Sequence, residues 1–190
     1  MSYFKFFILS VSIVALFTSC DSGPDPDQKY INTGKAASQA LMKSLKGALV
    51  TAIADSGIEG AINVCSEKAL VLTADIDARA DSITDIRRVS DKFRNPHNAP
   101  DASDTEALAY FREYQAKYDS LAGYHIVRSD TDVRYYQPLV IQPLCLNCHG
   151  QTDKMEANVL TAINKIYPED MAVGYQLGDL RGLIRVTMVK

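Results

Sequence analysis

The sequence has 190 residues, and its 20 lysines and arginines against 23 aspartates and glutamates give a net charge of −3. It contains no basic run and no stretch of alternating basic and aromatic residues, so nucleic acid is not expected as a partner. Hydrophobic residues make up 47% of the chain. The roughly 170 residues that follow the leader described next are enough for one domain with its own core.

The first residues have the composition of a secretory leader. Lys5 precedes an apolar run over residues 6–17 that is too short to cross a bilayer. The run ends in Thr18-Ser19-Cys20, which resembles a bacterial lipobox. We therefore expect a lipoprotein signal over residues 1–19, a lipid on Cys20, a flexible tether over 20–27, and a place in the bacterial cell envelope, facing the periplasm or on the surface. A plain secretory signal and an uncleaved anchor are the alternatives.

Two long helices are predicted to begin the domain, which spans residues 28–190. Apolar residues recur at every fourth position from Leu41 to Ile53, which predicts a helix over 28–54 that stops at Gly57. A second helix is predicted to reach about residue 80, and one face of it carries Ile58, Ile62, Cys65 and Ala69. Cys65 is thus expected to point into the core, where a buried cysteine usually acts as a small hydrophobe.

The middle of the chain predicts a strand, an ordered loop, a helix and a hairpin. The strand covers 83–90, and the loop over 91–101 is rich in turn-forming residues. Ser103 and Glu106 have the spacing of a capping box. They open a helix whose buried stripe is predicted to be Ala107, Tyr110, Phe111, Tyr114 and Tyr118. Two β-like runs, 123–128 and 133–141, are joined by the turn residues 129–132 and predict the hairpin.

The second hairpin strand leads directly into Cys145-Leu146-Asn147-Cys148-His149, a C-x-x-C-H motif. In an exported protein this spacing is typical of c-type haem attachment, because two thiols on about one helical turn can add to the two vinyl groups of one porphyrin. His149 would then bind the iron. The alternatives are a disulfide, half of a zinc site and a thioredoxin-like redox motif. A zinc site normally needs a second ligand pair, which does not follow in the sequence.

The last third predicts a helix over 155–166 and a final strand over 183–189. The glycine-rich loop over 174–182 lacks the spacing of a dinucleotide site. Within it, Arg181 is expected either to pair with Asp179 or to lie near the cofactor. Helices followed by strands, with at least one hairpin, predict an α+β fold in which helices pack on an antiparallel sheet.

Several longer motifs resemble one known family, the c-type haem domains with a PAS-like fold. They are Ala61-Ile62-Asn63-Val64-Cys65, Arg94-Asn95-Pro96-x-Asn98-Ala99-Pro100-Asp101, the C-x-x-C-H motif, and Tyr167-Pro168-x-Asp170-x-Ala172-x-Gly174-Tyr175 with Gly178-Asp179-x-Arg181-Gly182. Such domains occur as stand-alone exported proteins and as sensory domains of bacterial histidine kinases. The resemblance covers nearly the whole chain after the leader, and it implies a central antiparallel sheet flanked by helices.

The resemblance also implies an uncommon pair of axial iron ligands, His149 and Cys65, on one covalently bound haem c. His97, His125, Met155 and Met171 are the competing ligands, and His125 is read as a structural histidine within a strand. Guanidinium groups match carboxylates in geometry, so Arg87, Arg88 and Arg94 are candidates to bind the haem propionates. The alternative is that these three arginines are solvated surface charges.

We expect a membrane-tethered monohaem cytochrome that senses a redox change or a small molecule by displacement of Cys65. Because the chain ends at Lys190 without an output domain, a signal would pass to a separate protein. The alternative is a low-potential electron carrier of the cell envelope, with a redox partner protein. Enzymatic activity, such as that of a peroxidase, is the least expected function, since a six-coordinate iron has no open position.

Overall fold

The computed structural model describes residues 25–77 and 82–190, with the backbone alone for 63–77. The predicted leader, the lipidation site Cys20 and most of the tether therefore lie outside the described residues. In chain order the elements are α1 (Gln28–Asp77), β1 (Ile83–Val89), η1 (Pro96–Asn98), α2 (Ala102–Tyr118), β2 (His125–Arg128), β3 (Asp132–Val140), η2 (Pro143–Cys145), α3 (Leu146–His149), η3 (Thr152–Lys154), α4 (Ala157–Ile166) and β4 (Leu180–Val189).

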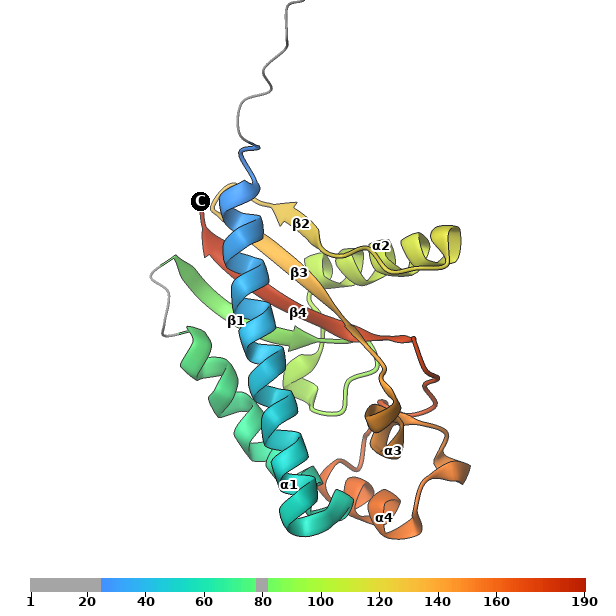
Figure 1. Ribbon diagram of the computed structural model, residues 1–190. Helices are drawn as coiled ribbons and strands as arrows, with labels where there is room; N and C mark the ends of the chain where they lie inside the picture. Colours follow the sequence, from blue (N-terminus) through green and yellow to red (C-terminus); the bar gives the residue numbers. More distant parts are fainter. Residues whose placement is uncertain (1–24, 78–81) are drawn as a thin grey trace, which may run out of the picture.

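The strands form one antiparallel sheet in the order β1-β4-β3-β2, so the last strand of the chain lies in its interior. Figure 1 shows α1 lying across one face of this sheet. Buried residues on that face include Leu41, Tyr135 and Val186, whereas α2 packs Phe111 and Leu108 against the other face. This arrangement confirms the predicted α+β class with its central antiparallel sheet. It also agrees with the predicted hairpin, which β2 and β3 form.

Helix α1 consists of two helical segments that meet at Gly57, as the sequence predicts. Gly57 has a φ of 70°, a left-handed conformation that glycine adopts without a steric penalty. The first segment packs on the sheet, and the second begins with Ile58 and Ile62, which lie against α4. Among the described residues, no helix combines the length and the apolar character needed to cross a membrane.

Helix α2 begins earlier than predicted, and its capping box uses other residues. Asp101 is the N-cap and Asp104 the third helical residue: the Asp101 side chain accepts from the Asp104 backbone N–H, and the Asp104 side chain accepts from the Asp101 N–H. The prediction of Ser103 and Glu106 was wrong because Asp101 and Asp104 have the same spacing two residues earlier, and their carboxylates accept from each other's backbone N–H groups. The predicted buried stripe is wrong at Tyr118, which is 53% exposed, and it omits Leu108, which is buried.

The C-x-x-C-H motif lies at one end of the sheet, beyond β3. There α3 and α4 pack beside the second segment of α1 (Figure 1). Helix α4 begins at Ala157, two residues after the predicted start, and ends at Ile166 as predicted. Strand β4 begins at Leu180 rather than at residue 183, because Leu180 pairs with Val140 in β3.

Candidate functional site

The two cysteines of the motif lie on consecutive short helical turns. Pro143 begins η2, and the chain continues without a break into α3, which carries Cys148 and His149. The Cys145 sulfur accepts from the backbone N–H of Gln142 at 3.4 Å. The two cysteines are thus three positions apart on one continuous helical path, which is close to the predicted spacing of about one turn.

Gly150 ends α3, and its lack of a side chain permits a close approach. Its N–H donates to the Leu146 carbonyl at 3.0 Å, and a Cβ atom at this position would lie 2.6 Å from the Leu146 oxygen. A side chain here would push α3 out of position. The glycine after C-x-x-C-H thus sets the local geometry of His149.

The ring of His149 is fixed by a backbone carbonyl. Its Nδ1 lies 2.7 Å from the oxygen of Ala172, and since a carbonyl only accepts, Nδ1 carries the proton. Two backbone bonds hold the partner segment in place, from Gly174 N–H to Gly150 O at 2.8 Å and from Tyr175 N–H to His149 O at 3.0 Å. In a neutral ring this leaves Nε2 as the atom with a lone pair for a metal ion.

The surroundings of His149 favour its neutral form. Burial lowers its pKa well below the usual value, and the positive charges of Arg181 and Arg94 lower it further, against the opposing effect of the bond to Ala172. The imidazole is therefore unprotonated at Nε2 at neutral pH. A neutral imidazole is the form of histidine that binds metals.

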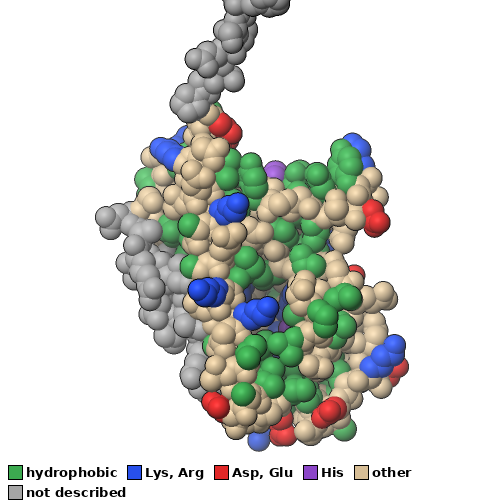
Figure 2. All heavy atoms as spheres, in the orientation of Figure 1, with side chains coloured by type: hydrophobic (Ala, Val, Ile, Leu, Met, Phe, Trp, Pro, Cys, Tyr) green, Lys and Arg blue, Asp and Glu red, His purple; other side chains and the backbone are tan. Residues whose placement is uncertain are grey.

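A cavity of about 190 Å³ lies beside these residues. In Figure 2 it is the hollow next to α1, with basic and histidine atoms visible in its depth and a mostly hydrophobic surface below it. Both segments of α1 and part of α3 form its apolar walls, while basic and amide side chains come from β1 and from the loop that follows. The lining residues include Leu49, Ile53, Ile58, Ala61, Ile62, Arg88, Arg94, Asn95, Asn98, Cys145, Cys148, His149, Tyr167 and Arg181.

The arginines predicted as carboxylate partners do not all reach this cavity. Arg88 and Arg94 line it, whereas Arg87 donates to the His97 carbonyl at 2.6 Å. Arg181 also lines the cavity. Its guanidinium donates to Ser90 Oγ at 3.0 Å and to the Lys92 carbonyl at 3.1 Å.

The structure does not place Arg181 in a pair with Asp179. Asp179 instead accepts from the backbone N–H of Gln176 at 2.7 Å. Burial lowers the pKa of Arg181, and the charges of Arg94 and Arg88 add to this effect. The guanidinium groups of Arg88, Arg94 and Arg181 thus lie near one another at one side of the cavity. In the sequence, Arg181 was marked only by the glycine-rich motif that contains it.

The competing iron ligands lie elsewhere. His97 is exposed and bonds to Asn95, and His125 stacks on Tyr110 with ring centroids 4.0 Å apart. Met155 packs near α4, and Met171 is 40% exposed. None of these four lines the cavity. Cys65 lies in α1, and its side chain is outside the described part of the structure.

The residues at the cavity fit a c-type haem. They supply two thiols on one short helical segment, a neutral imidazole with Nε2 available, apolar walls and a cationic side. In addition, Arg94 Nε is buried and has no hydrogen-bond partner among the described residues. A buried N–H group of a guanidinium without an acceptor is costly, and a cofactor carboxylate is a suitable acceptor.

Comparisons with known proteins identify the same fold and a family. A model of the Tll0287-like family matches residues 27–188. The crystal structure of the cyanobacterial haem protein Tll0287 is similar, with a TM-score of 0.61 and 24% sequence identity over 87% of this chain and 97% of that chain. No curated protein sequence matches this chain.

Proposed function

We propose that this chain, which belongs to the Tll0287-like family, is a c-type haem protein that carries haem on Cys145 and Cys148 and binds its iron through His149. The observation that carries the proposal is the position of all three residues on the consecutive helical turns η2 and α3 at the cavity, with His149 Nδ1 already bonded to Ala172 O. The haem protein Tll0287, which has a similar fold, supports it.

Haem, when bound, would supply an iron ion that exchanges one electron and coordinates small molecules. The protein's residues would orient the group and exclude water from it. Ile58 and Ile62 supply apolar surface from α1. Arg88, Arg94 and Arg181 supply positive charge for the two carboxylates, since guanidinium–carboxylate bonds are charge-assisted.

Cys65 is the residue that we propose would bind the haem iron together with His149. It follows Ile62 by three positions in α1, and Ile62 lines the cavity. Positions three apart lie on the same face of a helix. A thiolate donates electron density and favours ferric iron, so it would lower the reduction potential relative to a Met ligand.

We propose redox or small-molecule sensing as the biological role, in a protein tethered to the cell envelope through Cys20. A thiolate is sensitive to protonation and oxidation, so a redox change or an added ligand would displace it from the iron. Low-potential electron transfer to a partner protein is the alternative. Carriers keep their ligands on reduction, whereas a sensor of this kind exchanges one.

The attachment is tested by the Cys145→Ala/Cys148→Ala double variant, expressed with a c-type haem maturation system. The wild-type protein should gain the mass of one haem and retain it after denaturation, and the double variant should lose this covalent mass. Covalent haem in the double variant would contradict the proposal. The single variant His149→Ala keeps both attachment cysteines, but we expect it to be severely impaired in stable haem loading.

The ligand and the role are tested by optical and EPR spectra. Cys65→Ser should retain covalent haem and lose the low-spin thiolate spectrum of the ferric wild type. Carbon monoxide should bind the reduced wild-type protein if Cys65 is displaced, as sensing requires. A His/Met-like spectrum that carbon monoxide leaves unchanged would contradict Cys65 ligation and favour the electron carrier.

A further inference from the structure

We infer that Arg94, predicted from the sequence as a propionate partner, is a positioning residue that holds and tunes the imidazole of His149. This inference rests on the proposed haem site and extends it. One guanidinium nitrogen of Arg94, NH2, lies 2.5 Å from the Cys148 carbonyl, 3.0 Å from Asp170 Oδ2 and 3.4 Å from the Ala172 carbonyl. Arg94 therefore joins the cysteine motif to the segment that orients its histidine.

Helix α3 needs such a contact because it is only four residues long. The last carbonyls of a helix have no partner within it, and a basic side chain can satisfy them. Arg94 does this for Cys148, the residue directly before His149. Without the bond, the end of α3 would be held mainly by the bonds of His149 and Gly150 to the segment over 172–175 and by the close contact at Gly150.

The Ala172 carbonyl is the point at which Arg94 affects His149. It accepts from His149 Nδ1 at 2.7 Å and from Arg94 at the longer distance of 3.4 Å. A cation on the same oxygen draws electron density from it and makes it a weaker acceptor for Nδ1–H. The imidazole is then a weaker electron donor at Nε2, because the second-shell bond sets the basicity of a ligating histidine.

Asp170 holds this arrangement in place and balances the charge of Arg94. Its side chain is 4% exposed, and it binds Arg94 through Oδ2 and the Ala172 backbone N–H through Oδ1 at 2.8 Å. A buried ion pair adds little net stability. Its geometry, however, sets the position of Ala172 and thus of the carbonyl that His149 uses. Lys92 supports the same segment through the Val173 carbonyl at 2.5 Å.

The test compares holoproteins by redox titration and ferric EPR. Arg94→Gln should shift the reduction potential to a more negative value, by about tenfold in the equilibrium constant for reduction, which is ~59 mV for one electron. It should also change the EPR g values, since the ring orientation is no longer fixed. The control is Arg112→Gln, which removes the exposed ion pair of Arg112 with Asp91 and should leave both readouts at their wild-type values.

Arg94→Lys separates positioning from charge alone. Lysine keeps the charge, but its side chain is one bond shorter than that of arginine and ends in a compact ammonium. Its Nζ atom therefore falls short of the position from which Arg94 NH2 contacts the three acceptors, and the g values should still change. Wild-type g values and potential in Arg94→Lys would overturn the inference, whether or not Arg94→Gln folds. The proposed function fails differently, since the wild-type protein would then carry no covalent haem.

Discussion

Arg181 brings a positive charge to the cavity, whereas the sequence left its place open between the cofactor and a pair with Asp179. Its side chain contacts Ser90 and the Lys92 carbonyl, which are 91 and 89 residues earlier in the sequence. Cys145, Cys148 and His149 could be predicted because the chemistry of their motif is local. Arg87 and Arg88 are adjacent in sequence, and only the strand geometry separates the one at the cavity from the one at the His97 carbonyl.

The Arg181→Gln variant tests the charge at this position. A nearby cation lowers the pKa of a carboxylate, so its loss should raise the pKa of a haem propionate toward neutral pH. The reduction potential of the variant should then rise as the pH falls between about 7 and 5, more steeply than in the wild type. Arg181→Lys should largely restore the wild-type slope. Equal slopes in the glutamine variant and the wild type would show that no propionate lies near Arg181.

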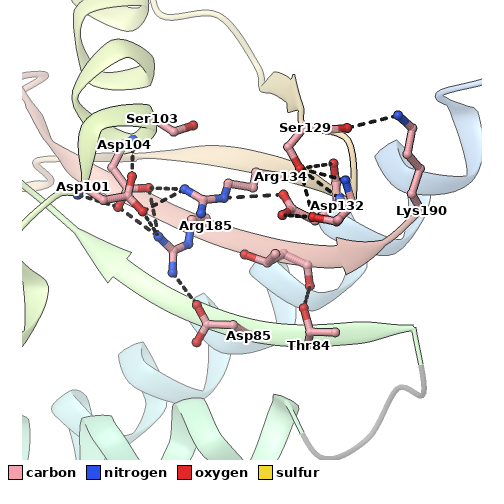
Figure 3. Close-up of polar contacts among 12 residues, drawn as sticks. Thr84, Asp85, Asp101, Ser103, Asp104, Ser129, Asp132, Arg134, Arg185 and Lys190 are labelled. Carbon is pink, nitrogen blue, oxygen red and sulfur yellow. Dashed lines mark hydrogen bonds and ion pairs between the residues drawn. The ribbon is translucent and has the colours of Figure 1, made fainter.

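At the scale of elements, an ion-pair network joins the start of α2 to the sheet (Figure 3). Arg185 of β4 binds Asp85 of β1 and both Asp101 and Asp104 of the capping box, and Arg134 of β3 also binds Asp101. Asp104 is fully buried and accepts from the Tyr136 hydroxyl at 3.0 Å. The sequence identified none of these pairs, because their members lie up to 100 residues apart.

This network predicts a loss of stability in acid. Burial raises the pKa of Asp101, but the Asp104 backbone N–H and Arg134 outweigh this effect and hold the pKa below its usual value. A carboxyl group with a depressed folded-state pKa stabilises the protein above its unfolded-state pKa of about 3.9, and this contribution is lost as the pH falls through the folded-state value.

Urea unfolding between pH 3 and pH 7 measures the effect. Asp101→Asn keeps a good N-cap residue and removes the titrating group, so the free energy of unfolding should fall at pH 7 and depend less on pH near 4. Because Asp101 is 44% exposed, we expect a loss of less than about 1 kcal/mol. An unchanged pH dependence in Asp101→Asn would assign the acid sensitivity to other carboxylates.

The contact between α1 and the sheet depends on a glycine. A Cβ atom on Gly34 would lie 2.3 Å from Cγ of Tyr135, whereas one on Gly47 would have no neighbour within 4 Å. Gly34→Ala should therefore lower the free energy of unfolding by about 1–3 kcal/mol through overpacking. Gly47→Ala, in the same helix, should raise it by up to about 1 kcal/mol. Thermal unfolding of both variants checks the contrast, and equal shifts would contradict the close packing.

For the whole molecule, the sequence predicted the α+β class, the break at Gly57 and the hairpin, because each has a local signal in periodicity or glycine. Apart from the hairpin of β2 and β3, it did not predict which strands are neighbours, since the positions of β1 and β4 in the order β1-β4-β3-β2 depend on pairing between distant segments. It also contained no direct sign of the cavity, whose lining residues come from α1, β1, α3, the start of β4 and the segments that connect these elements.

The distribution of apolar cores predicts which part of the molecule depends on the cofactor. Two clusters cover the faces of the sheet, whereas the end that carries α3 and α4 has two smaller clusters, around Val159 and around Ile141. A haem in the cavity would contact both segments of α1 and also α3, and would add apolar burial where the protein has little of its own.

Hydrogen exchange should therefore distinguish the haem-loaded wild type from the haem-free Cys145→Ala/Cys148→Ala variant. Regions with few apolar contacts open at lower free energy than the global unfolding reaction, so amides of α4 should exchange faster in the haem-free protein. Amides of β3 and β4, which pair along nearly their whole length, should change much less and serve as the internal control. Equal protection of α4 in both forms would mean that its packing on Ile62 suffices without the cofactor.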